Sequence, residues 1–234
     1  MTAPQPLPDA LRRLVGEEPG PVAPLASPVV RALPAAGWGA VALFVVVALV
    51  GLRGDAPRLG PLLTWGPAAV QAVLGFVLVV LALAAAVPGR GAGRGPAALA
   101  AAASVAALVA EAVLASRVSG TTPVANPWID HGPACFALTL LFGASALLVV
   151  GLLIARASPL RAGTPALLGG AGCGVLAEGI WRLHCPLADP RHVLTWHLGA
   201  VVVLALAALA AGRAREAREA AGMARRLAPR GIRA

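Results

Sequence analysis

The feature that most constrains the fold is a series of six long apolar runs between Ala35 and Gly212 that carry very few charged side chains. An α-helix rises about 1.5 Å per residue and the hydrocarbon core of a bilayer is about 30 Å thick, so each run can cross it as a helix. The runs are Ala35–Leu52, Leu62–Val87, Pro96–Ser116, Pro133–Ala155, Thr164–Leu183 and Val193–Gly212. They predict an all-α integral membrane protein whose residues 35–212 form a six-helix transmembrane bundle.

The composition supports this fold class. Hydrophobic residues make up 59% of the chain and charged residues 12%, and the mean hydropathy is +0.82. These values lie outside the range of soluble globular domains. No Ser/His/Asp constellation, catalytic carboxylate pair or phosphate-binding loop stands out, so we expect a protein that is not an enzyme.

The basic residues indicate the partners and the sidedness. All 19 are arginine, and almost all lie outside the apolar runs, so the net charge of +9 describes loops and tails that contact anionic lipid rather than nucleic acid directly. Fourteen arginines fall in the N-terminal segment, the second and fourth loops and the C-terminal tail, and five in the opposite set. The positive-inside rule therefore predicts that both termini are cytoplasmic. The third run, which is alanine-rich and carries Glu111, is the least secure span.

Two polar segments flank the bundle. Residues 1–34 form a proline-rich leader, which we expect to be cytoplasmic, and residues 213–234 form an Arg-rich cytoplasmic tail. Four apolar residues of the leader recur at helical spacing: Leu7, Leu11, Leu14 and Val15. They predict a short amphipathic helix that docks onto a protein partner, and the alternative is a tail that is disordered or lies on the membrane surface.

Two polar islands interrupt the apolar pattern, HCPLADPRHVLTWH at His184–His197 and NPWIDHGPAC at Asn126–Cys135. The predicted topology places both at the outer face, with Cys135 opening the fourth span and Cys185 closing the fifth. The two cysteines can be a disulfide, a thiolate pair for a soft metal, a redox sensor, or two unrelated buried thiols. Cys173, in the middle of the fifth run, is most simply a packing residue.

The islands also hold candidate metal ligands. Besides the two cysteines, these are His131, His184, His192, His197 and Asp189. The donors suit zinc or copper, although no spacing among them matches a structural zinc signature and no CxxCH haem motif is present. A soft metal ion is therefore the cofactor to consider, and none is certain.

Two acidic residues lie inside the apolar runs. Glu178 and Arg182 are four residues apart and can pair on one helical face, and Glu111 lies near Arg117. We favour a structural role for both acids. The alternative function is a small membrane transporter or metal-binding membrane protein that uses Glu111, Glu178 and the outer-face histidines.

The order of these features resembles the NrsF family, negative regulators of SigF-type extracytoplasmic-function sigma factors. The resemblance rests on Cys135 after a tryptophan-containing loop, on L-H-C-P-x-x-D-P at Leu183–Pro190 and on T-W-H-L-G-A at Thr195–Ala200. It implies an anti-sigma factor of a bacterial inner membrane, in which Cys135 and Cys185 take part in signal sensing. A change at the outer face would then repack spans four to six and release the sigma factor in the cytoplasm.

Overall fold

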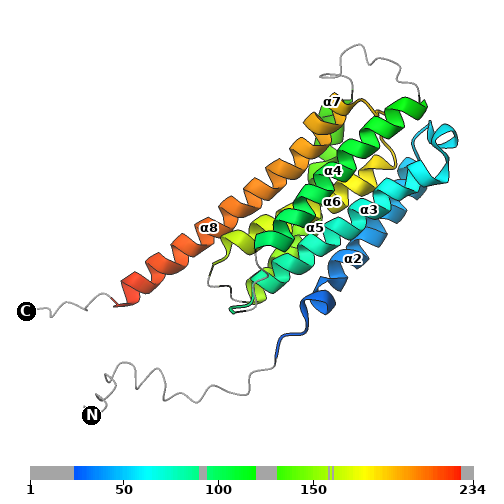
Figure 1. Ribbon diagram of the computed structural model, residues 1–234. Coiled ribbons are helices and arrows are strands. Elements are labelled where there is room, and N and C mark those ends of the chain that lie inside the picture. Colours follow the sequence, from blue (N-terminus) through cyan, green and yellow to red (C-terminus); the bar gives the residue numbers. More distant parts are fainter. Residues whose placement is uncertain (1–23, 90–93, 120–130, 158, 160, 228–234) are drawn as a thin grey trace, which may run out of the picture.

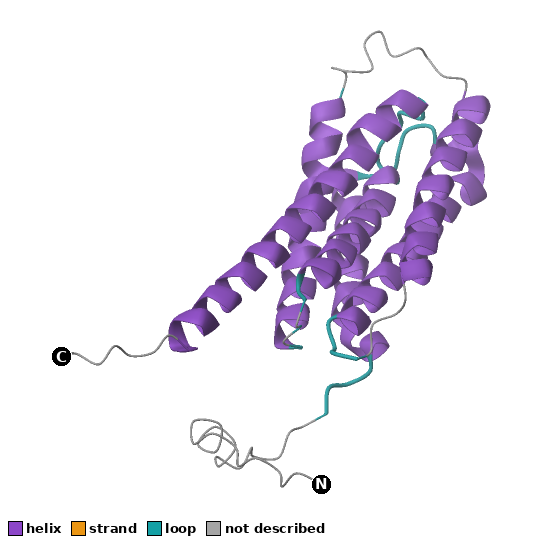
Figure 2. Ribbon diagram, turned by 60° about the vertical axis from the view of Figure 1, so that its left-hand side comes forward, coloured by secondary structure: helices purple, strands orange, loops and turns teal. Residues whose placement is uncertain are grey.

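A computed structural model describes residues 24–89, 94–119, 131–157, 159 and 161–227. The leader residues Leu7, Leu11, Leu14 and Val15 lie outside the described residues, as does the first half of the Asn126–Cys135 island, residues 126–130. Within the described part of the chain the regular secondary structure is entirely helical (Figure 2). The all-α fold class is therefore confirmed.

Nine helical elements follow one another within the described ranges, two of them short π-helical segments. They are α2 (Pro28–Val45), η1 (Val46–Val50), α3 (Ala56–Ala85), α4 (Arg94–Ser119), α5 (Gly132–Arg156), α6 (Gly163–Arg182), α7 (Pro190–His192), η2 (Val193–Leu198) and α8 (Gly199–Leu227). The elements α7, η2 and α8 continue one another without a break, so they form a single long helix.

Five helices in the described part of the chain are long and apolar enough to cross a membrane. They are Pro28–Val50, Ala56–Ala85, Gly95–Val118, Gly132–Arg156 and Pro190–Arg225. Leucines on their outer surfaces are open to the surroundings, and Leu99 and Leu148 are each 72% exposed. A bundle that turns such side chains outward suits lipid rather than water. The chain is therefore a multi-pass membrane protein.

The remaining predicted span is the fifth, Thr164–Leu183, which corresponds to α6. It is long enough but less apolar than the other five, because six of its 20 residues are glycine and it carries Glu178 and Arg182. It lies in the middle of the bundle, between α3, α5 and α8 (Figure 1), and fifteen of its residues are buried. A helix enclosed by other helices does not need the apolar surface that a lipid-facing helix needs. The count of six spans therefore stays a prediction.

Glycines let the neighbours approach α6 closely. A methyl group on Gly170 would lie 2.7 Å from Ala208 Cβ of α8, and one on Gly172 would lie 2.8 Å from the backbone oxygen of Gly75 in α3. Gly174 likewise faces Val201 of α8. The pair Gly170 and Gly174, which has GxxxG spacing, thus forms a helix contact through small residues.

The helices extend beyond the predicted spans. The first begins at Pro28 rather than Ala35, because the Ser27 side chain accepts a hydrogen bond from Val30 N and proline suits the first turn. Arg31 is buried, and its guanidinium donates to Leu83 O of α3 and Leu153 O of α5, near the ends of those helices. A cation suits this position because carbonyl groups are unpaired at helix C-termini.

The last helix continues past the predicted boundary at Gly212 as far as Leu227. Its end and the start of α2 lie at one end of the molecule, and α7 lies at the opposite end (Figure 1). The long helix therefore joins the α7 end of the bundle directly to its other end.

Candidate functional site

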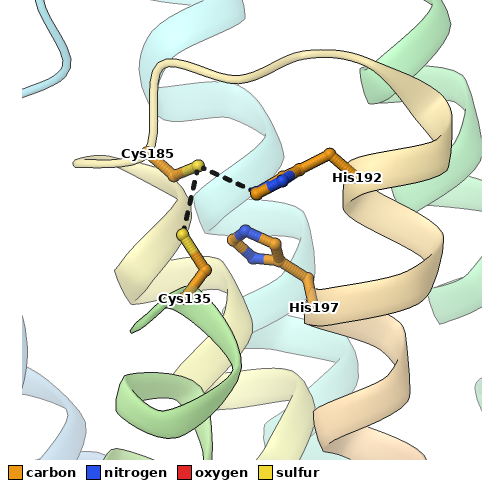
Figure 3. Close-up of side chains that lie close together, drawn as sticks. All are labelled: Cys135, Cys185, His192 and His197. Atoms are coloured by element: carbon orange, nitrogen blue, oxygen red, sulfur yellow. Dashed lines mark hydrogen bonds between the residues drawn. The ribbon is translucent and has the colours of Figure 1, made fainter. Parts of the chain in front are cut away.

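Cys135 and Cys185 meet at the α7 end of the bundle (Figure 3). Cys135 lies in the first turn of α5, which begins at Gly132, and Cys185 lies just past Arg182, the last residue of α6. Both side chains are buried, and their Sγ atoms are 3.7 Å apart. The antiparallel packing of α5 and α6 thus brings together the two cysteines that the sequence placed at one level.

Two histidines of the following helix face the same sulfurs (Figure 3). His192 Nε2 lies 3.6 Å from Cys185 Sγ, and the rings of His192 and His197 are 5.4 Å apart. Both histidines are completely buried. In a regular α-helix, residues five apart point in directions about 140° apart. The π-helical segment η2 changes this, because its i to i+5 hydrogen bonds place residues five apart on the same side.

Cys135, Cys185, His192 and His197 form what we call the thiol–imidazole cluster. One potential ligand atom from each residue lies within 4.8 Å of all the others, and all four residues are buried. The arrangement supplies two sulfur and two nitrogen donors from α5, the α6–α7 loop, α7 and η2. This is a donor set for thiol redox chemistry or for binding a soft or borderline metal ion.

The other predicted ligands lie outside this cluster. Asp189 is the N-cap of α7, where its carboxylate accepts a hydrogen bond from Arg191 N. His184 Nδ1 lies 3.0 Å from Gly51 O, and its ring lies beside that of Trp181. His131 is the left-handed N-cap of α5.

His131 and His184 instead line a cavity of about 400 Å³ whose wall includes both Cys135 and Cys185. The other lining residues are Leu52, Gly54, Ala134, Leu138, Trp181, Pro186 and Leu187. Both cysteines therefore border a space that is large enough for a small reagent.

The α6–α7 loop that carries Cys185 is held on both sides by Arg53, a buried residue between η1 and α3. Arg53 N donates to Leu183 O at 2.8 Å, and its guanidinium donates to Pro186 O at 3.1 Å. Asp55 pairs with the same guanidinium. Arg53 thereby fixes the backbone on either side of Cys185.

A buried charge network lies beneath the cluster. Arg182 Nε donates to Glu111 Oε1 at 2.8 Å, and Arg182 Nη1 donates to Leu187 O at 2.7 Å. Arg182 therefore bonds to Glu111 of α4 rather than to Glu178, its expected partner one turn earlier in α6. The Glu178 carboxylate instead lies 3.7 Å from His197 Nδ1. The network links α4 and α6 to the helix that carries the cluster histidines.

Electrostatics favour a thiolate at Cys185. The pKa of Cys185 lies below its usual value, first because the Cys135 thiol donates a hydrogen bond to its sulfur, and also because of His192 and His197. Burial acts in the opposite direction. A lowered pKa makes the Cys185 sulfur a better nucleophile toward oxidants and a better ligand for metal ions.

Sequence reasoning listed all four residues of the cluster but missed how they combine. It assigned the cysteines to sensing and grouped His192 and His197 with three further metal candidates. It did not identify Arg53, whose only signal is an isolated arginine between Gly51 and Gly54 in a short turn.

These features define a class of protein, a multi-pass helical membrane protein with a buried thiol–imidazole cluster at one end and a basic helix leaving the other. A family model described as NrsF, negative regulator of sigma F, matches residues 16–215. The match covers most of the chain, and the chain belongs to the NrsF family. The comparison with curated proteins gave no match, and neither did the comparison with solved structures. The family description makes this chain a regulatory protein and a sigma factor its partner.

Proposed function

We propose that this protein is an anti-sigma factor of a bacterial inner membrane. It holds an extracytoplasmic-function sigma factor inactive and releases it on a periplasmic redox or metal signal received at Cys135 and Cys185. The observation that carries the proposal is the 3.7 Å separation of the two Sγ atoms at the bundle end opposite the basic end of α8. Membership of the NrsF family supports the regulatory role. We place both termini in the cytoplasm and count α6 as a membrane span, which brings the number of spans to six.

The long helix from Pro190 to Leu227 offers a route for the signal. It begins at His192 and His197 and continues to the Arg-rich end of α8. Its 36 residues from Pro190 to Arg225 span about 54 Å, which exceeds the ~30 Å hydrocarbon core. A change in the cluster would therefore shift or rotate a helix whose far end lies in the cytoplasm. The affinity of the protein for the sigma factor would then fall.

The chemistry of the redox signal is simple. Hydrogen peroxide oxidises the two thiols to a disulfide, and two water molecules form, so the atoms and electrons balance. The sulfurs must approach from 3.7 Å to about 2.05 Å, which requires rotation of the cysteine side chains and a small movement of the loop.

The test is co-purification of the full-length protein from its native membranes, followed by mass spectrometry. We expect a stoichiometric sigma factor, which hydrogen peroxide or a soft metal releases from the wild type. Release should be lost in Cys135→Ser and Cys185→Ser, and kept in Cys173→Ser, since Cys173 lies buried in α6 outside the cluster. Absence of a sigma factor would refute the function, and unchanged release from both serine variants would refute the sensor.

The alternative is a transporter whose pathway uses Glu111, Glu178 and the outer-face histidines. In the structure, Glu111 pairs with Arg182, and Glu178 lies 3.7 Å from His197 Nδ1, so each of the two acidic side chains faces a basic side chain. This pairing favours a structural role. Metal-dependent flux in proteoliposomes, lost in Glu178→Gln, would support the transporter instead.

A further inference from the structure

We propose that Cys135, Cys185, His192 and His197 form a closed tetrahedral zinc site. The ion would tie the α6–α7 loop to the start of α5 and to the first turns of the long helix. This site deepens the proposed function, because the sensor is the same cluster, but zinc binding itself does not depend on a sigma factor.

The distances agree with tetrahedral coordination. Zinc–sulfur bonds of about 2.3 Å and zinc–nitrogen bonds of about 2.0–2.1 Å put two sulfurs about 3.8 Å apart and a sulfur and a nitrogen about 3.6 Å apart. The measured separations are 3.7 Å for Cys135 Sγ to Cys185 Sγ and 3.6 Å for Cys185 Sγ to His192 Nε2. All four donors lie within 4.8 Å of one another, so small side-chain rotations complete the tetrahedron.

His197 supplies independent support. It is completely buried, and neither ring nitrogen has a hydrogen-bond partner among the described residues. A neutral imidazole has one donor and one acceptor, and leaving both buried without partners is unfavourable. Its ring points toward the sulfurs (Figure 3). A metal ion bound to one ring nitrogen of His197 would give that buried nitrogen a partner.

The second nitrogen of His197 faces a carboxylate. Glu178 Oε1 lies 3.7 Å from His197 Nδ1, and both Glu178 oxygens also lack a hydrogen-bond partner in the described structure. Metal-binding histidines commonly donate their other N–H to a carboxylate, which orients the ring. Glu178, His197 and the ion would form such a chain, with Nε2 of His197 left for the metal. Glu178 is then a positioning residue rather than a ligand.

The donor set selects the ion. Two sulfurs and two nitrogens in a tetrahedron suit zinc, whereas calcium and magnesium require oxygen ligands. Iron–sulfur clusters generally need four ligating residues that are mostly thiolates. The third cysteine, Cys173, lies too far away to serve as a ligand, because it is about 14 Å along the helix axis from the end of α6 at Arg182. Two thiolates also neutralise one Zn²⁺, which suits a buried site.

The first test measures zinc in full-length protein purified in detergent with an affinity tag that contains no histidine. We expect about one zinc per chain in the wild type, and less than about 0.2 in His192→Gln and His197→Gln. The matched controls are His131→Gln and His184→Gln, which change a histidine outside the cluster and should keep the metal. Circular dichroism checks that each variant remains helical.

The second test uses Co²⁺ as a spectroscopic probe of the metal-free protein. Cobalt in the cluster should give tetrahedral d–d bands and a sulfur-to-metal charge-transfer band. The charge-transfer band should weaken in Cys135→Ser and in Cys185→Ser. Competition with a chelator should show zinc bound about 10–100-fold more weakly in Glu178→Gln, because that variant loses the orienting carboxylate.

The results separate this proposal from the proposed function. A wild type without zinc that gives no charge-transfer band with Co²⁺ overturns the zinc site. Zinc lost in the cysteine variants but kept in His192→Gln and His197→Gln also overturns it, because the site would then be a thiolate pair. Neither result touches sigma-factor release, and a zinc-bound protein without a sigma factor would refute only the regulatory function.

Discussion

His192 and His197 have their ring centroids 5.4 Å apart on the same side of one helix, although His197 follows His192 by five positions. The π-helical segment η2 makes this possible, and such segments are rare and frequently found at functional sites. It lies where the helix meets Cys185 of the preceding loop. The local distortion and the convergence of sulfur and nitrogen donors are therefore parts of one arrangement.

Gly132 should be essential for the contact between α5 and η2. A methyl group at this position would overlap the indole of Trp196, whereas one on Gly151 of the same helix would meet nothing within 4 Å. We expect Gly132→Ala to move Cys135 away from His197, to lower Tm by several degrees and to speed alkylation of Cys135. Gly151→Ala should be neutral or slightly stabilising, since alanine favours helix by about 0.5–1 kcal/mol. Equal Tm and alkylation rates in the two variants would contradict this packing.

Arg53 should control the exposure of Cys185 without controlling the fold. Arg53→Ala keeps the backbone bond to Leu183 O but removes the bond to Pro186 O and the pair with Asp55. The loop then loses its support after Cys185, so we expect at least a tenfold faster reaction of Cys185 with a small maleimide. Arg58→Ala, which changes an exposed arginine of α3, is the control and should react like the wild type. Mass spectrometry of the labelled peptide measures both rates.

The sequence predicted the architecture because a bilayer leaves few choices. Backbone groups in hydrocarbon must bond within their own segment, so long apolar runs become helices. The meeting of Cys135 and Cys185 follows from the same logic, because a short connection between two helices places their far ends side by side. The boundaries of the helices were less predictable. Ser27 caps the start of α2 inside the predicted leader, and α8 continues into the predicted Arg-rich tail.

The details of the site depended on geometry that a sequence pattern does not contain. The 3.6-residue period of an α-helix puts His192 and His197 on different faces of the helix. The π-helical segment places both on the same face. The sequence paired Arg182 with Glu178 because the two are four residues apart, but α4 brings Glu111 to 2.8 Å from the Arg182 guanidinium. Contacts across helices depend on helix rotation, and small residues such as Gly172 and Gly75 set that rotation through close backbone contact.

Removing one partner of the Glu111–Arg182 pair should lower the free energy of unfolding by a large amount, whereas replacing both partners should lower it much less. Both side chains are buried, at 4% and 2% exposure, so Arg182→Met leaves an unpaired buried carboxylate and should cost about 3–5 kcal/mol of unfolding free energy. The double variant Glu111→Leu, Arg182→Met should recover most of that loss. The exposed pair Arg215–Glu219 is the control, and Arg215→Ala should cost less than about 0.5 kcal/mol. Denaturant titration in detergent measures each value, and additive losses in the double variant would contradict the pairing.

The last prediction concerns whether α6 crosses the membrane. Its glycines and its charged residues keep α6 out of the five helices that are apolar enough to cross a membrane by composition. However, α3, α5 and α8 enclose it, so it needs little affinity for lipid. Arg161 and Arg191 are exposed and lie on either side of α6, and Gly222 lies near the end of α8. In a cysteine-free background we introduce one cysteine at a time, as Arg161→Cys, Arg191→Cys or Gly222→Cys.

A membrane-impermeant maleimide applied to intact cells should label Arg191→Cys from the periplasm. Arg161→Cys and Gly222→Cys should react only after the membrane is permeabilised, because the arginine distribution predicts that both positions are cytoplasmic. Immunoblotting of the membrane fraction confirms that each variant is inserted at the level of the background protein. Labelling of Arg161→Cys and Arg191→Cys from the same side would mean that α6 does not cross. The protein would then have five spans, and the count of six would be wrong.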